Sequence, residues 1–355
     1  MAIQQMFLGA GGASAPLHVD DVFNITTYTG TGLSHPINNG IDVAGKGGLV
    51  WLKSLDALSS PWDNKEYNCL FDNIRTGGSN GGAGGGGRLR TENVEAAQSD
   101  TYLSSYNSDG FTITPSSTVS AAELVNESGK DFVSFTFRKA PGFFDVVEYT
   151  GDGNTSKTIP HSLDSIPGFI VVKKTSDSGK WFVYSRITGA SEWMMWQTND
   201  ASDDNYTTWP WNATTPTSTQ FTVNGVHPSD DVYDVNVTGE TYIAYLFAHD
   251  DARFGDDGDE SIIHCGSFNQ PSGGTPVTVT TGFEPQWIMI KPYDNGGNWT
   301  IWDAERTWNN FFSPNQDDPE THYGSPYFTV SSTGFTMTQT MNGQGYPTIY
   351  VAIAG

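Results

Sequence analysis

Short stretches of alternating apolar and polar residues run along almost the whole chain. Residues 131–138, Asp-Phe-Val-Ser-Phe-Thr-Phe-Arg, are typical of them. A period of two places one set of side chains in a core and the other set outside it, as in a β-strand. Gly, Asn, Asp and Pro separate the stretches, which suits tight turns. The pattern predicts an all-β fold of antiparallel β-sandwich or jelly-roll modules, with few and short helices.

The pattern occurs three times along the chain. Each copy contains an apolar strand that ends in lysine, followed by a strand that ends in arginine. These residues are Lys53, Lys173 and Lys291, and Arg75, Arg186 and Arg306. The lysines lie 120 and 118 positions apart (173 minus 53 and 291 minus 173). Copies of about 110 residues match one sandwich domain each, so the sequence predicts three tandem repeats.

The repeat pattern restarts near Ala140 and within an acidic stretch at 250–260. We therefore expect an N-terminal docking arm at 1–21, repeats at 22–140 and 141–250, and a diverged third repeat at 251–355. Both joints are short, which favours modules that pack against one another with limited swing.

The N-terminal arm carries the apolar residues Ile3, Met6, Phe7 and Leu8, followed by small residues. An arm of this kind is disordered unless something binds it. We therefore expect it to dock into a neighbouring subunit or another protein. The start of the chain lacks a basic region and has too short an apolar stretch for a secretory signal, which predicts synthesis in a cytoplasm.

The charge of the chain excludes several classes of partner. The sequence has 40 acidic and 17 basic residues, a formal charge of -23. Phosphate backbones and anionic lipids would be repelled by most of such a surface. No run of about 18 apolar residues is present, so we expect neither nucleic-acid binding nor membrane insertion. Two widely separated cysteines, Cys69 and Cys265, predict reduced thiols.

The sequence offers no convincing catalytic constellation. Glycan hydrolysis needs two carboxylates roughly 5 to 9.5 Å apart. Asp72, Asp303 and Glu305 lie near the arginine-ending strands, but the second copy has no acid there, so we interpret them as ion-pair partners of the arginines. The seven histidines lack zinc-site spacing, and no nucleophile elbow or phosphate loop is present. We predict no catalytic residue, no metal and no cofactor.

Three further groups carry alternative interpretations. Asp256, Asp257, Asp259 and Glu260 offer oxygen ligands for calcium, but not in EF-hand order, so we interpret them as a solvated linker. The repeated lysines and arginines are interpreted as partners of carboxylates at the sandwich edge.

The aromatic stretch at 206–211 stands beside Asn and Thr residues. An aromatic face packs on the apolar face of a sugar while amides bond its hydroxyls. We therefore predict ligand binding at Tyr206, Trp209 and Trp211. The alternative is that these rings pack at a domain interface.

Several motifs resemble those of repeat-bearing virion proteins of marine bacteriophages, cyanophages especially. They are the opening residues 1–12, Tyr-Thr-Gly-x-Gly at 28–32 and 149–153, and the junctions at 135–145 and 245–250. The resemblance implies a structural protein of the particle, tail fibre or tail-associated, with lectin-like jelly-roll modules and no catalytic residues. The third copy lacks the Tyr-Thr-Gly-x-Gly motif.

These observations predict a virion structural protein, made in the host cytoplasm, that binds other virion proteins and a host surface glycan. Weak single sites favour a homo-oligomer, a trimer if the protein is a fibre. A capsid decoration or head-fibre protein is one alternative, because the sequence has no coiled-coil or collagen-like shaft. A polysaccharide depolymerase is the alternative from another class.

Overall fold

The computed structural model describes residues 15–58, 66–75, 87–98, 102–114, 123–225, 235–341 and 345–355. The helices among these residues are η1 (Val19–Asp21), α1 (Val43–Lys46) and α2 (Glu123–Asn126). None of them is long and apolar enough to cross a membrane. Antiparallel strands form the rest of the regular structure, which confirms the prediction of an all-β fold.

The first module consists of a five-stranded and a three-stranded sheet. The larger sheet has the order β1 (Phe23–Thr29), β8 (Asp131–Arg138), β3 (Gly48–Ser54), β4 (Asn68–Asp72) and β5 (Leu89–Arg90). The smaller sheet has the order β2 (His35–Asn38), β7 (Gly110–Ile113) and β6 (Leu103–Asn107).

The second module follows directly. Its larger sheet has the order β9 (Phe144–Thr150), β15 (Thr241–Phe247), β11 (Phe169–Lys174), β12 (Trp181–Ser185) and β13 (Met194–Met195). Its smaller sheet pairs β10 (Lys157–Pro160) with β14 (Gln220–Val223).

The third module has the largest sheet. Its order is β16 (Ile263–Asn269), β24 (Pro347–Ala354), β18 (Pro285–Pro292), β19 (Thr300–Asp303), β20 (Asn310–Phe312) and β21 (Thr321–His322). The smaller sheet has the order β17 (Val277–Thr280), β23 (Gly334–Met337) and β22 (Phe328–Ser331).

The strand orders of the three modules correspond. In each larger sheet the first strand of the module pairs with its last strand, and the last strand pairs with the lysine-ending strand. The lysines occupy matching register positions, because Lys53, Lys173 and Lys291 each lie opposite an apolar residue of the last strand. The exact boundaries at 22–140, 141–250 and 251–355 stay a prediction.

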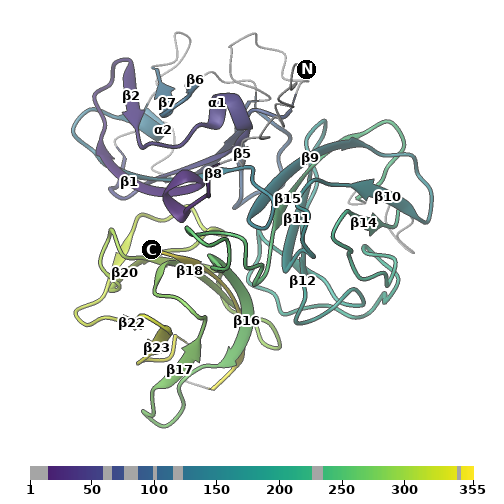
Figure 1. The fold of residues 1–355 in the computed structure, drawn as a ribbon. Helices are drawn as coiled ribbons and strands as arrows, with labels where there is room; N and C mark the ends of the chain where they lie inside the picture. The colour runs from purple at the N-terminus through teal and green to yellow at the C-terminus, as the bar shows by residue number, and fades with distance from the viewer. Residues whose placement is uncertain are drawn as a thin grey trace, which may run out of the picture.

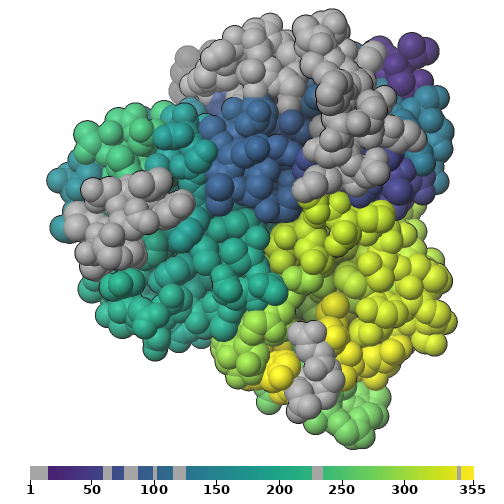
Figure 2. Space-filling view, turned by 180° about the vertical axis from the view of Figure 1, so that it is seen from behind, coloured from purple at the N-terminus to yellow at the C-terminus, as the bar shows by residue number. Residues whose placement is uncertain are grey.

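The three modules pack around a common centre (Figure 1). A continuous cluster of buried apolar residues joins all three. Trp51 of the first module lies 5.3 Å from Trp196 of the second, and Trp196 lies 6.3 Å from Trp299 of the third. Phe135 and Trp287, 6.0 Å apart, join the first module to the third. Figure 2 shows the three modules in direct contact when seen from behind. The modules therefore share one core instead of hanging from flexible joints.

Strand β3 shows how the two faces of a larger sheet are used. All seven of its residues are buried. Val50 and Leu52 belong to a separate apolar cluster within the first module, whereas Leu49 and Trp51 belong to the shared cluster. Because side chains alternate along a strand, Lys53 lies on the same face as Leu49 and Trp51. The alternation therefore directs the lysine toward the neighbouring module.

The Tyr-Thr-Gly-x-Gly motif has a structural cause. The hydroxyls of Tyr28 and Tyr149 donate to the backbone carbonyls of residues 125 and 235, at 2.7 and 2.6 Å. A Cβ atom on the first glycine of either motif, Gly30 or Gly151, would lie about 2 Å from a backbone carbonyl oxygen. The side chains of Asn126 and Asn236, both fully buried, accept a backbone N–H from the same turns. The motif holds a turn against the module and is not a ligand site.

Candidate functional site

The three repeated lysines lie at the junctions between modules. Each side chain is buried, with an exposed fraction of 1% or less. Lys53 donates to the backbone carbonyl of Asp318 in the third module (2.7 Å), and also to that of Glu66. Lys291 donates to Asp200 of the second module and to Gly297 of its own module, both at 2.6 Å.

Lys173 completes the set, because its ammonium donates to the carbonyls of Val94 in the first module (3.2 Å) and Gly179 in its own (2.8 Å). The prediction that the lysines pair with carboxylates at a sandwich edge was wrong. They lie within the junctions and bind backbone carbonyls, which gives each ammonium hydrogen-bond partners where water is excluded.

A second set of donors repeats beside the lysines. Asn68 lies directly opposite Lys53, and Trp181 lies directly opposite Lys173. Trp299 precedes Thr300, which is the residue opposite Ile290. The amide of Asn68 donates to the carbonyl of Gln316 (3.0 Å), and the indole N–H of Trp299 donates to that of Met195 (3.0 Å). The indole of Trp181 donates to carbonyls of residues 90 and 93, at 3.0 and 3.1 Å.

The acceptors belong to three equivalent loops, which we call clasp loops. They span residues 88–98, 193–203 and 311–321, and each is closed at its base by antiparallel pairing. Backbone bonds add to each contact. The N–H groups of Glu66, Gly179 and Gly297 donate to residues 317, 94 and 199 of the neighbouring clasp loops, at 3.0, 2.7 and 2.7 Å.

The contacts close a ring. The first clasp loop binds the second module, the second clasp loop binds the third module, and the third clasp loop binds the first module. Each junction joins different surfaces of the two modules, which makes it a head-to-tail interface that closes after three steps.

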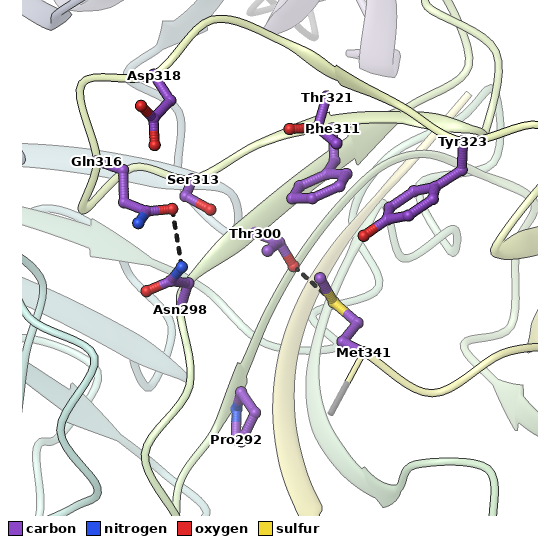
Figure 3. Close-up of a pocket in the computed structure, with 10 residues that line it drawn as sticks. All are labelled: Pro292, Asn298, Thr300, Phe311, Ser313, Gln316, Asp318, Thr321, Tyr323 and Met341. Atoms are coloured by element: carbon purple, nitrogen blue, oxygen red, sulfur yellow. Dashed lines mark hydrogen bonds between the residues drawn. The ribbon is translucent and has the colours of Figure 1, made fainter. Parts of the chain in front are cut away.

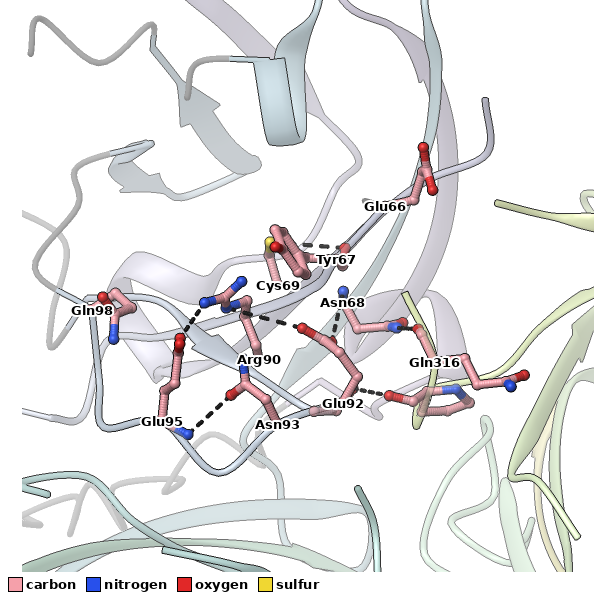
Figure 4. Close-up of polar contacts among 12 residues, drawn as sticks. Glu66, Tyr67, Asn68, Cys69, Arg90, Glu92, Asn93, Glu95, Gln98 and Gln316 are labelled. Carbon is pink, nitrogen blue, oxygen red and sulfur yellow. Dashed lines mark hydrogen bonds and ion pairs between the residues drawn. The ribbon is translucent and has the colours of Figure 1, made fainter. Parts of the chain in front are cut away.

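The ionisable side chains at the junctions are unusual because they are buried. Desolvation lowers the pKa of Lys173 to about 7, and those of Lys53 and Lys291 to about 8. Burial raises the pKa of Glu92 to about 7, although Arg90 and Lys53 oppose that rise. Figure 4 shows Glu92 between Asn68, whose backbone N–H donates to it at 3.2 Å, and Arg90. A carboxyl with a raised pKa can act as a general acid, but this one is enclosed in a junction.

Two of the three repeated arginines form buried ion pairs, as the sequence predicted. The guanidinium of Arg75 lies 2.6 Å from Asp72, and that of Arg306 lies 2.6 Å from Asp303. Arg186, which has no acid at the matching position, is exposed. The carboxylates of Asp72 and Asp303 therefore pair with buried arginine side chains and do not face a groove.

A pocket of about 200 Å³ opens in the third module, between β19 and the third clasp loop. Figure 3 shows polar side chains on one side of the pocket and the rings of Phe311 and Tyr323 on the other. The residues that line it are Pro292, Asn298, Thr300, Phe311, Ser313, Gln316, Asp318, Thr321, Tyr323 and Met341. Its donors, acceptors and aromatic rings can bind a small polar ligand.

The predicted aromatic site has a different arrangement. The exposed fractions of Trp209 and Trp211 are 3% and 2%. Trp209 packs edge-on against Phe182, 4.8 Å away, and Trp211 packs against another ring of β12. Tyr206 is half-buried against the same cluster. Neither indole offers a face to a sugar, and both pack within the second module instead of at the domain interface that was the alternative.

The docking residues Ile3, Met6, Phe7 and Leu8 lie outside the described residues. The part of the arm that is described, residues 15–21, lies against the acidic joint. The backbone N–H of Gly255 donates to residue 17 (2.9 Å), and His18 lies 3.4 Å from Asp256. The described end of the arm therefore lies beside the joint between the second and third modules.

Among the described residues, one group brings together atoms that could bind a metal ion. It consists of His249, Asp250 and His264, and these atoms lie within 4.8 Å of one another. A backbone N–H of β16 donates to Nδ1 of His249 (3.1 Å), and the Tyr350 hydroxyl lies 2.9 Å from Nδ1 of His264. Burial and the charge of Arg186 lower the pKa of His249 to about 4. The Nδ1 atoms of both histidines therefore take part in hydrogen bonds within the protein.

Sequence reasoning missed the pocket and the clasp loops. The repeated lysines were a signal for the junctions, because each copy has a lysine at the end of an apolar strand and each of these lysines lies at a junction. Nothing in the sequence marks the acceptors, since they are backbone carbonyls. Asp318 matches Asp200 of the second copy, whose carbonyl also accepts from a repeated lysine, but the pocket residues as a set do not recur.

A search of curated proteins finds no match to this chain. The family described as "Domain of unknown function (DUF7483)" matches residues 18–355, which include all three modules. The chain therefore belongs to the DUF7483 family.

Proposed function

We propose that this protein is a structural component of a bacteriophage particle, a tail-fibre or tail-associated protein, and that it works by binding and not by catalysis. The observation that carries the proposal is the closed ring of three modules. A ring held by buried lysines and a shared aromatic core is a rigid body. Such a body suits a part that must hold its shape while its outer loops contact partners.

The partners that fit this proposal are other virion proteins, further copies of the chain and a host surface glycan. The arm at 1–21 is the proposed virion contact, because its described end lies on the surface beside the joint at 251–260. Copies that act together would make weak single contacts useful, since linked sites gain avidity without new contacts.

The test is to locate the chain in purified particles. Mass spectrometry of gradient-purified phage should detect it, and antibody labelling should place it on the tail by electron microscopy. Deleting residues 1–12 should abolish its incorporation while the purified variant keeps the near-UV circular dichroism of the intact chain. Absence of the intact chain from purified particles would overturn the proposal. Labelling over the capsid would favour a decoration or head-fibre role instead.

The depolymerase alternative makes an opposite prediction. Incubation of the full chain with host polysaccharide should release no reducing ends. The reason is that the buried carboxylates Asp72, Asp303 and Glu92 contact arginine or lysine charges at sites closed to a polymer.

A further inference from the structure

We propose that the pocket of the third module binds one saccharide ring, and that it prefers a neutral or positively charged sugar to an acidic one. This inference rests on the proposed binding role and names its ligand class and position. It moves the expected sugar contact from the buried tryptophans of the second module to a site whose polar groups face an open space (Figure 3).

The size of the pocket limits the ligand to a small unit. A volume of about 200 Å³ lies below the range of roughly 300 to 1,000 Å³ that is typical of pockets for drug-sized ligands. One six-membered ring with its hydroxyls is the kind of ligand that such a space admits. A longer glycan would place its remaining units outside.

The polar side of the pocket suits pairs of hydroxyl groups. The side-chain oxygen of Gln316 accepts from the amide of Asn298 (2.8 Å), and this bond fixes the orientation of the Gln316 amide. Its NH₂ group then remains to donate to a ligand. Asp318 is exposed, and its backbone carbonyl, not its carboxylate, is the group bound by Lys53. A donor and an acceptor side by side match neighbouring sugar hydroxyls, each of which both donates and accepts.

The other side of the pocket suits the apolar face of a sugar. Tyr323 is half-buried, and its ring stacks on that of Phe311 with 5.5 Å between centroids. Figure 3 shows the Tyr323 hydroxyl pointing toward Thr300 and Met341. Pro292 extends the apolar surface below them. Aromatic rings bury large areas while keeping a polar group in contact with the ligand.

Charge sets the preference among sugars. Asp318 is the charged side chain among the residues that line the pocket, and the whole chain carries a formal charge of -23. An acidic sugar would meet like charge both locally and over the surface. A protonated amino sugar would gain an ion pair with the Asp318 carboxylate.

The neighbouring module holds the pocket wall in place. The carbonyls of Ser313 and Gln316 accept from Asn68 of the first module, at 3.4 and 3.0 Å, and that of Asp318 accepts from Lys53. A wall that is fixed before binding costs less ordering on binding. The ring closure thus prepares the site.

The third clasp loop has the same length as its two equivalents. Its matching base residues, Phe311 and Thr321, are 10 positions apart (321 minus 311), as are those of the others (98 minus 88 and 203 minus 193). The side chains of this loop, not its length, therefore distinguish the pocket, to which it supplies Gln316 and Asp318.

The test uses the full chain and three probes: glucose, glucosamine and glucuronate. Ligand-observed NMR and titration calorimetry should show binding of glucose and glucosamine at neutral pH and much weaker binding of glucuronate. Gln316→Ala should weaken the binding of glucose and of glucosamine about tenfold or more, because it removes hydrogen bonds from the site. Asp318→Asn, which keeps the shape of the side chain, should remove the preference for glucosamine over glucose. Asp294→Asn, an exposed acid of the same module outside the pocket, is the matched control and should change neither.

Two results would overturn the inference. One is the absence of binding by all three probes to the folded chain. The other is binding that Gln316→Ala and Asp318→Asn leave unchanged, since the sugar then lies elsewhere. Both differ from failure of the proposed particle role, which the presence of the chain in purified virions reports independently. A variant that binds no sugar yet enters particles normally would separate the two.

Discussion

Replacing Lys291 with methionine tests whether a buried ammonium holds the junction between the second and third modules. Methionine has a similar length and no charge. In the wild-type protein, burial lowers the pKa of Lys291 from 10.5 to about 8. Between these two values the unfolded chain carries a proton that the folded protein has released. The free energy of unfolding therefore rises with pH in this window, and the contribution of Lys291 is smallest below pH 8.

The magnitude follows from the two pKa values. A difference of about 2.5 corresponds to roughly 3 kcal/mol, of which about 2 kcal/mol is regained between pH 7.5 and 9.5. Lys291→Met also leaves the carbonyls of Asp200 and Gly297 without this donor, at a cost of about 1 to 3 kcal/mol each. At pH 7.5 the loss of these hydrogen bonds destabilises the variant, whereas removal of the desolvated ammonium stabilises it. The change with pH, not the absolute stability, is the diagnostic quantity.

The assay is urea unfolding followed by tryptophan fluorescence at pH 7.5 and 9.5, for the wild type and Lys291→Met. The stability difference between the two proteins should shift by about 2 kcal/mol in favour of the wild type at the higher pH. The exposed Lys46→Met is the control and should shift nothing. Equal pH dependence in the wild type and Lys291→Met would refute the assignment of a desolvated ammonium to this junction.

Four further substitutions, one of them a control, test the packing by the same unfolding assay. Asp303→Asn removes the buried partner of Arg306 and should cost about 3 kcal/mol, whereas Arg186→Gln, at the exposed equivalent, should change stability by less than about 0.5 kcal/mol. Trp181→Phe removes the indole donor to the first clasp loop and should cost about 1 to 2 kcal/mol. Trp209→Ala should cost about 3 to 5 kcal/mol, since the ring is buried, and a soluble, fully stable variant would contradict its placement.

The strands could be predicted because their alternation is local. Lys53, Lys173 and Lys291 end their strands at matching positions, and the pairing register agrees with that alignment. The ion pairs of Arg75 and Arg306 could also be predicted, because their partners lie three residues away in the sequence.

The junctions and the pocket could not be predicted, because their groups come from distant parts of the chain. Lys53 and the carbonyl that it binds in the third module are 265 positions apart. A backbone carbonyl has no signature in the sequence, so the lysines were assigned to carboxylates. Trp209 was assigned to a sugar site because Thr and Asn surround it, yet it packs beside Phe182 of β12. Local polarity did not report tertiary burial.

Closure of the ring has a consequence for how this architecture can change in evolution. An open array of repeats tolerates the gain or loss of a copy, because each unit contacts its neighbours alone. Here every clasp loop is occupied, the last of them by the first module. A fourth copy would have no unoccupied clasp loop to contact. Loss of one copy would leave a repeated lysine without the backbone carbonyl that it binds. Three separate one-module chains around a threefold axis could make the same contacts. The geometry of the junctions therefore closes at three copies, whether the modules belong to one chain or to three.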